Sequence, residues 1–226
     1  MLWAHNAKQE RLLVVPIDSE GELKQWPPDQ TMVNDKAAAI WATASRAHYN
    51  TDLQFNSQSL VVAMTEPKSI GGRAWPSVAF GGLGHEFAFS LWCNSTLGIL
   101  LHWWLSNKTQ SGRGSFTITS IPNIPTMDTR ALSDEQHAEA RRQFDLLRHE
   151  RFLPFDQIDE DPARARLDRA ILVDVLGLPE SLVEPGGPID LIRRKLAREP
   201  QIHGGKRARV VFTDDGEKSV KRDDRD

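Results

Sequence analysis

The sequence predicts an α+β fold: mixed strands around a long buried helix, then a small helical region and a disordered tail. Three observations support it. Strand-like and helical runs mix before residue 130 without regular strand–helix alternation. The run from Phe87 to Leu105 contains no Asp, Glu, Lys or Arg, and beyond Pro125 apolar residues recur at helical spacing among charges. We therefore expect an α+β domain over residues 1–130, a helical accessory region over 131–200 and a charged, largely disordered tail over 201–226.

The first eighty residues are expected to form strands around one helix. Arg11 to Pro16 is rich in branched apolar residues, which predicts a strand, and residues 22–26 could return as its hairpin partner. Asn34 or Asp35 can cap a helix that runs to about Ala47. Further strands are expected at 53–55, 59–64 and 77–80, with a glycine-containing loop over 66–75.

The run from Phe87 to Leu105 is about as long as a bilayer crossing. It nevertheless carries polar residues that lipid disfavours, among them Asn94, Thr96 and His102. We therefore expect one long helix buried inside the domain and no membrane span, with His102 as a core histidine that has a backbone or hydroxyl partner. A loop with two cations follows, and then a predicted strand over 116–119.

The C-terminal region carries clear helix signals. Ser133 or Asp134 can cap an amphipathic helix that ends near residue 150. A second helix is predicted from Pro162 to 176, stopping at Gly177, and a third over 189–198. From Gln201 onward the chain is charged and interrupted by glycines, which predicts disorder, with a short strand at 207–212 as the open alternative.

Composition limits the classes of function. The net charge of −3 creates no general basic field, so any contact with DNA must come from a local patch. Cys93 is the single cysteine, which excludes a disulfide within the chain and a cysteine-based zinc site. With no secretory signal in the sequence, we expect a cytoplasmic protein. The seven histidines are scattered, and none has the spacing of a metal site on one helix turn.

Four pieces of sequence, in this order, resemble one known family. They are FNSQSLVVAMTEPKSIGGRAW, NSTLG, SGRGSFTITSIPNIP and LDRAILVDVLGLP, and the resemblance covers roughly Trp41 to Leu178. Together they resemble the C-terminal target-recognition region of N6-adenine DNA methyltransferases and of the single-chain restriction–modification enzymes built on them. The resemblance implies a DNA-binding specificity module without its own catalytic motifs, so no catalytic activity is expected of the chain alone. Its implied partners are double-stranded DNA and a catalytic methyltransferase chain, and the missing catalytic domain would bind S-adenosylmethionine.

The loop after the apolar run supplies the predicted DNA contacts. Cations there can neutralise phosphates, and hydrogen-bonding side chains can read base edges. Gly112 and Gly114 would let the loop adapt to DNA, and Trp75 is predicted either to stack or to pack in the core. The alternative is that this loop is only a solvated surface loop without a DNA contact. The candidate DNA-binding residues are Arg73, Lys108, Gln110, Ser111 and Arg113.

The run from Phe80 to Gly84 matches an F-x-G-x-G pattern that methyltransferases use for S-adenosylmethionine. No acidic residue ends the next predicted strand, and no Asn-Pro-Pro-aromatic or Asp-Pro-Pro-aromatic tetrapeptide follows. We therefore interpret these glycines as shaping the entry into a helix at His85. Two alternatives stay open: a protein-interaction domain with no DNA role, and a degenerate S-adenosylmethionine-binding fragment.

Overall fold

The structure is a computed structural model of the 226-residue chain, and it confirms the α+β class. It describes all residues except 3–5, 9–10, 21–26, 28–29, 83, 110–111, 204–208, 213–217 and 222–226. Up to the expected boundary at 130, the elements are α1 (Thr31–Ala42), β1 (Ser45–Tyr49), β2 (Asp52–Gln54), β3 (Val62–Ser69), β4 (Ser77–Val78), α2 (His85–Asn94), α3 (Thr96–Leu105), β5 (Asn107–Thr109), β6 (Arg113–Ser115) and η2 (Ile121–Asn123), with η3 (Thr129–Ala131) across it. Beyond it lie α4 (Asp134–Leu147), η4 (Phe155–Glu160), α5 (Pro162–Arg169), η5 (Ala170–Val175), η6 (Glu180–Leu182), α6 (Pro188–Ala197), α7 (Pro200–His203), β7 (Arg209–Phe212) and β8 (Lys218–Lys221).

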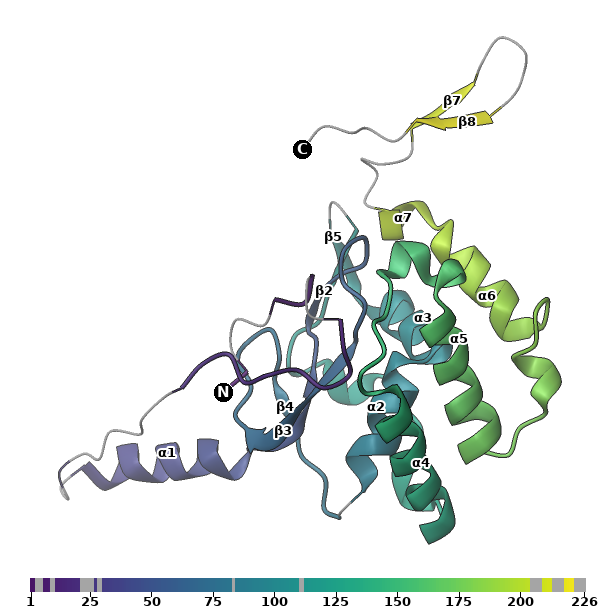
Figure 1. The fold of residues 1–226 in the computed structure, drawn as a ribbon. Coiled ribbons are helices and arrows are strands. Elements are labelled where there is room, and N and C mark those ends of the chain that lie inside the picture. The colour runs from purple at the N-terminus through teal and green to yellow at the C-terminus, as the bar shows by residue number, and fades with distance from the viewer. Residues whose placement is uncertain are drawn as a thin grey trace.

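The strands form small antiparallel sheets (Figure 1). One has the order β3-β1-β4 and another the order β2-β6-β5. The central strand β1 was not predicted, because the expected helix ran to Ala47 whereas α1 ends at Ala42. Strand β1 lies between β3 and β4, and its residues Ala47, His48 and Tyr49 are buried. Strand pairing and burial therefore determine the conformation of this segment, although its local sequence favours a helix.

The predictions for the other N-terminal strands have mixed outcomes. Those at 53–55, 59–64 and 77–80 correspond to β2, β3 and β4 with shifted bounds, and β3 extends to Ser69 into the expected loop. The predicted strand from Arg11 to Pro16 is wrong, since this segment contributes only an isolated bridge from Val14 to Met64. Its expected hairpin partner, 22–26, lies outside the described residues.

The single long buried helix is also wrong, because the apolar run divides at Ser95 into α2 and α3. Ser95 has an extended backbone (φ −71°, ψ 163°), and its hydroxyl accepts a hydrogen bond from the amide of Gly98. A Cβ on Gly98 would lie 2.6 Å from the carbonyl oxygen of Cys93, so the two helices meet at a distance that only glycine allows. Among the described residues, no helix has the length and apolar character that a membrane crossing requires.

The predicted C-terminal helices are confirmed as α4, α5 and α6, with α5 continuing into the π-helical turn η5. Ser133 begins α4 through a reciprocal capping box with Gln136, and Gly177 follows η5 with a φ of +68°. Helix α4 and turn η5 pack against α2, and α6 packs against α3 (Figure 1). The helical region therefore shares one continuous hydrophobic core with the sheets.

The tail begins after α7. Strands β7 and β8 pair as an antiparallel hairpin, in line with the alternative of a strand near 207–212. The prediction of disorder otherwise concerns residues that lie outside those described. The division into three regions at 130 and 200 stays a prediction.

Candidate nucleic-acid interface

The predicted DNA-binding loop is a β-hairpin made by β5 and β6. Lys108 pairs with Gly114 and Thr109 with Arg113, and β2 extends the sheet on the other side of β6. The strand expected at 116–119 is wrong, because the ladder stops at Ser115 and residues 118–120 form a turn. Gly112 supplies the turn, with a φ of +73°.

Gly114 does not act as the flexible hinge that the sequence suggested. It is buried in β6, where a Cβ would lie 2.8 Å from the ring of Phe55 and would also meet Ser106. The absent side chain thus lets β6 lie directly against the core. Strand β2 pairs with β6, and Lys108 of β5 bonds back to the end of α3, so the base of the hairpin is attached to the body of the molecule.

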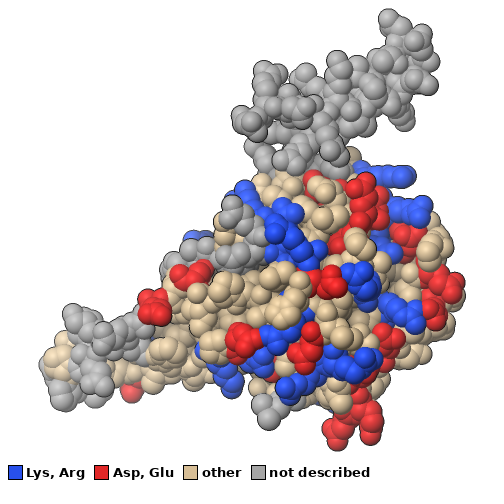
Figure 2. Space-filling model, in the orientation of Figure 1, with Lys and Arg blue, Asp and Glu red and all other residues tan. Residues whose placement is uncertain are grey.

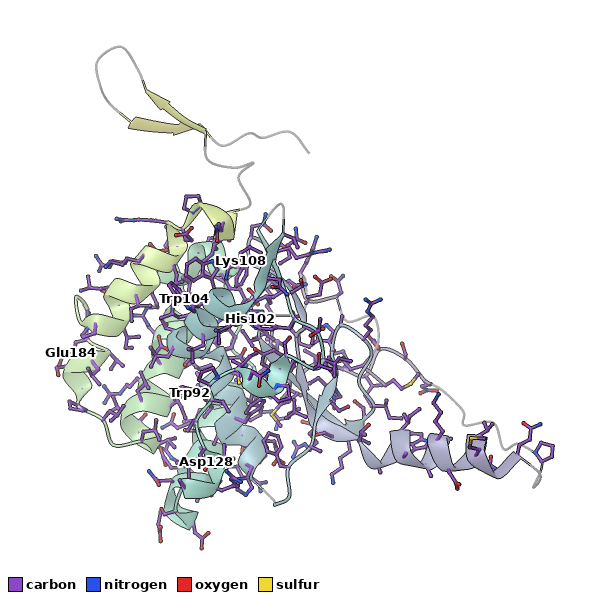
Figure 3. The ribbon with its side chains drawn as sticks, turned by 180° about the vertical axis from the view of Figure 1, so that it is seen from behind. Trp92, His102, Trp104, Lys108, Asp128 and Glu184 are labelled. Carbon is purple, nitrogen blue, oxygen red and sulfur yellow. The ribbon has the colours of Figure 1, made fainter. Side chains whose placement is uncertain are left out.

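Lys108 lies just beyond the end of α3 and turns back onto it. Its ammonium donates hydrogen bonds to the carbonyl oxygens of Trp104 (2.8 Å) and Ser106 (3.0 Å), where helix carbonyls favour a cation. It also lies 5.1 Å from the centre of the Trp103 ring. Burial lowers the pKa of Lys108. Trp104 beside it is 68% exposed, and Figure 3 shows both at the same end of the molecule.

Arg113 is half-exposed and forms an ion pair with Asp52 on the neighbouring strand β2, at 3.3 Å. Ion pairs between side chains this exposed contribute little to stability, so another anion can readily replace the carboxylate. The two remaining predicted residues of this loop, Gln110 and Ser111, lie outside the described residues.

Arg73, predicted as a separate cation, is exposed on a loop that adjoins the same sheet. Its carbonyl oxygen accepts a hydrogen bond from the hydroxyl of Thr51 (3.0 Å), and Thr51 directly precedes β2. The structure therefore brings the Arg73 loop to the sheet that carries Lys108 and Arg113. The neighbouring Trp75 is 3% exposed and belongs to the core, so the packing alternative for Trp75 is confirmed.

The face of the molecule drawn in Figure 2 carries charges of both signs. Figure 2 shows Lys and Arg side chains interspersed with Asp and Glu over the face in view. Together with the net charge of −3, this limits any DNA contact to a few local cations.

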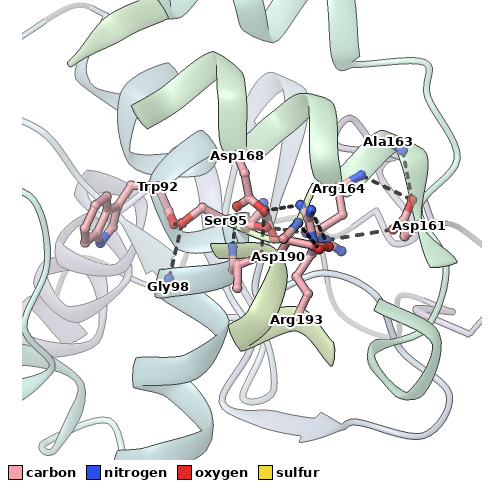
Figure 4. Close-up of polar contacts among 12 residues, drawn as sticks. Trp92, Ser95, Gly98, Asp161, Ala163, Arg164, Asp168, Asp190 and Arg193 are labelled. Atoms are coloured by element: carbon pink, nitrogen blue, oxygen red, sulfur yellow. Dashed lines mark hydrogen bonds and ion pairs between the residues drawn. The ribbon is translucent and has the colours of Figure 1, made fainter. Parts of the chain in front are cut away.

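The N-S-T-L-G run lies in a buried polar network that sequence reasoning missed (Figure 4). Asp168 accepts hydrogen bonds from the amide (2.7 Å) and hydroxyl (2.6 Å) of Thr96, and from Arg193 at 2.8 Å. Burial raises the pKa of Asp168, and the hydrogen bonds from Thr96 and the charge of Arg193 act in the opposite direction and lower it. The fully buried Arg164 donates to the carbonyl oxygens of Asn94 and Ser59. This network joins the α2–α3 junction to α5 and α6, so we interpret the run as structural.

The run from Phe80 to Gly84 leads into α2, as predicted. Gly84 precedes the helix with a φ of +92°, in the left-handed region that favours glycine. A hollow of about 290 Å³ beside Gly81 and Gly82 is lined in part by Arg46 and Glu86, which lie 3.8 Å apart. Leu83 of the pattern lies outside the described residues.

A larger apolar groove of about 400 Å³ opens between β4, α2 and the segment over 118–126. Tyr49 and Cys93 reach its lining, and the hydroxyl of Tyr49 forms a 2.8 Å hydrogen bond with Nδ1 of His102. Burial lowers the pKa of His102 to about 3 and raises that of the Cys93 thiol, so both stay uncharged near neutral pH. Within the described residues, no group of three or more His, Cys, Asp or Glu side chains could hold a metal ion.

No protein-family model, no curated protein and no solved structure matches this chain. The resemblance to the target-recognition region of adenine methyltransferases therefore stays a hypothesis that rests on the four quoted pieces of sequence.

Proposed function

We propose that this chain is a DNA-binding specificity module of an adenine-specific methyltransferase or restriction–modification system, and that it acts in the cytoplasm. The observation that carries the proposal is the β5–β6 hairpin, which presents exposed Lys108, Thr109 and Arg113 and pairs with β2. Strands of β-ribbons and β-sheets can contact DNA in its grooves. The exposed Arg73 on the adjoining loop adds a third cation to the same sheet.

The charge distribution supports weak binding by the isolated chain. Lys108 and Arg113 would contact phosphates, and such contacts lose affinity as salt rises because they release counterions from DNA. With a net charge of −3, the chain adds little long-range attraction. A catalytic partner chain that binds S-adenosylmethionine would supply the remaining phosphate contacts and the methyl transfer.

The test is the salt dependence of binding to a labelled duplex, measured by fluorescence anisotropy at low ionic strength. The double variant Lys108→Ala/Arg113→Ala removes one lysine and one carboxylate-paired arginine from the hairpin. The matched control Lys36→Ala/Arg130→Ala removes the same pair of charges elsewhere, since Arg130 pairs with Asp128. Figure 1 places α1 away from the hairpin, and Figure 3 places Asp128 at the opposite end from Lys108.

Each lost phosphate contact lowers the salt slope by about 1, so the hairpin variant should lower it by about 2 and the control should leave it unchanged. Equal effects of the two double variants, or no binding by the native chain at low salt, would contradict the proposal.

A protein-interaction domain without a DNA role is the second candidate. The observation in its favour is the set of exposed apolar side chains on α1, together with the apolar groove.

A further inference from the structure

The indole of Trp104 lies at the surface, at the end of α3 from which the β5–β6 hairpin continues. It is 68% exposed, whereas tryptophan in folded proteins is on average largely buried. Its ring contacts that of Trp103, with the ring centres 6.0 Å apart and the planes at 62°. Most of this large apolar ring is therefore available to a partner, and aromatic side chains of this kind are enriched where proteins bind other molecules.

A cation is held beside this ring. The ammonium of Lys108 donates a hydrogen bond to the carbonyl oxygen of Trp104 at 2.8 Å, and it lies 5.1 Å from the centre of the Trp103 ring. Helix α3 and strand β5 contain no Asp or Glu, and Asp52, the single acid in β2, β5 and β6, pairs with Arg113. The chemistry of this surface therefore suits a partner that offers a negative charge and a flat ring together.

We propose that Trp104 stacks on an unpaired base of a single-stranded DNA segment that adjoins the duplex, while Lys108 contacts a neighbouring phosphate. Proteins that bind unpaired DNA combine cations along the backbone with aromatic rings on which bases stack. Inside an intact duplex the neighbouring base pairs cover the faces of each base, so an exposed indole can stack only on a base outside the duplex. The proposal rests on the DNA-binding function proposed above and names the part of the DNA that Trp104 contacts.

The experiment measures binding of three labelled probes by fluorescence anisotropy at low ionic strength. The first is a fully paired duplex, and the second is the same duplex with a short single-stranded overhang of deoxyadenosines. The third carries an overhang of equal length built from abasic nucleotides, which keeps the phosphates and removes the bases. Comparison of the second and third probes therefore measures stacking separately from the attraction of cations to phosphates.

The variants are Trp104→Ala, which removes the ring, and Trp104→Phe, which keeps an aromatic ring. The matched control is Trp41→Ala, which removes another exposed tryptophan, on α1 and away from the hairpin (Figure 1). Because both tryptophans are exposed, far-UV circular dichroism should show an unchanged fold for every variant. The native chain should bind the deoxyadenosine overhang roughly tenfold more tightly than the abasic overhang, as expected for one stacked base.

Trp104→Ala should abolish this difference without weakening binding of the fully paired duplex, whereas Trp104→Phe should keep most of it and Trp41→Ala all of it. Equal binding of the two overhangs by the native chain would overturn the proposal, and so would a preference that Trp104→Ala leaves intact. If the fully paired duplex still binds in either case, the stacking role alone fails and the proposed function stands. A native chain that binds none of the three probes would overturn both.

Discussion

Removing the carboxylate of Asp168 should cost a large part of the stability of this fold. Asp168 is fully buried and accepts hydrogen bonds from the amide and hydroxyl of Thr96 and from Arg193. In Asp168→Ala the first amide of α3 loses its acceptor, and the nearly buried guanidinium of Arg193 loses that contact but keeps its longer pair with Asp190. The fully buried Arg164 loses a nearby opposite charge as well.

Breaking a buried ion pair by removing one partner typically costs about 3–5 kcal/mol, because the other charge stays buried. Domains of this kind are stable by only about 5–15 kcal/mol, so the variant should lose about a fifth or more of its unfolding free energy. Asp168→Asn should lose less of its unfolding free energy, because the side-chain amide oxygen can still accept a hydrogen bond from the backbone amide of Thr96.

Urea unfolding followed by tryptophan fluorescence measures this difference as a lower midpoint at a constant slope. Glu150→Ala is the matched control, since Glu150 forms an ion pair with Arg166 that is exposed on both sides, and it should not move the midpoint. If the unfolding free energy of Asp168→Ala lies within about 1 kcal/mol of that of the native chain, the buried ion pairs of Asp168 do not stabilise the fold as we infer.

Three further predictions follow from the geometry. Gly98→Ala should destabilise the fold strongly, because its Cβ would lie 2.6 Å from a backbone carbonyl, whereas Gly81→Ala meets no atom within 4 Å and should unfold like the native chain in the same urea titration. Burial lowers the pKa of His48 from 6.5 to about 4. Between these pH values the unfolded chain binds a proton that the folded chain does not, so the unfolding free energy should fall by about 3 kcal/mol as the pH drops from 6.5 to 4. His48→Gln should flatten that part of the pH profile, and an unchanged slope would refute this assignment. Asp52→Asn frees Arg113 from its ion pair and should tighten DNA binding at low salt, so weaker binding in the anisotropy assay would argue against the hairpin as the contact.

The elements that sequence patterns predicted well are those with local signals. Ser133 and Gln136 form the capping box of α4 with each other, so four consecutive residues contain the whole interaction. Gly177 ends the second helix in the same way, because its positive φ is a property of one residue. His102 was correctly interpreted as a core histidine with a hydroxyl partner, which is Tyr49.

The secondary-structure predictions fail where contacts between residues far apart in the sequence determine the backbone conformation. Strand β1 exists because β3 and β4 pair with it, and neither neighbour is visible in the local pattern. The break at Ser95 did leave a signal, since a run of three cap-forming residues, Asn94 to Thr96, is unusual inside an apolar helix. The acceptor that completes this cap, Asp168, lies 72 residues away.

For the candidate interface, the sequence predicted which cations lie in the hairpin but not what they contact. Lys108 is bound to the end of α3 and Arg113 to Asp52, so both cations already have partners within the protein. The Arg113–Asp52 contact is at the surface, where an ion pair contributes about 0.2–1 kcal/mol, while a phosphate contact also releases counterions from DNA. Exchanging Asp52 for a phosphate therefore costs little. Asp52 therefore competes only weakly with a phosphate for Arg113, and this competition is what Asp52→Asn should remove.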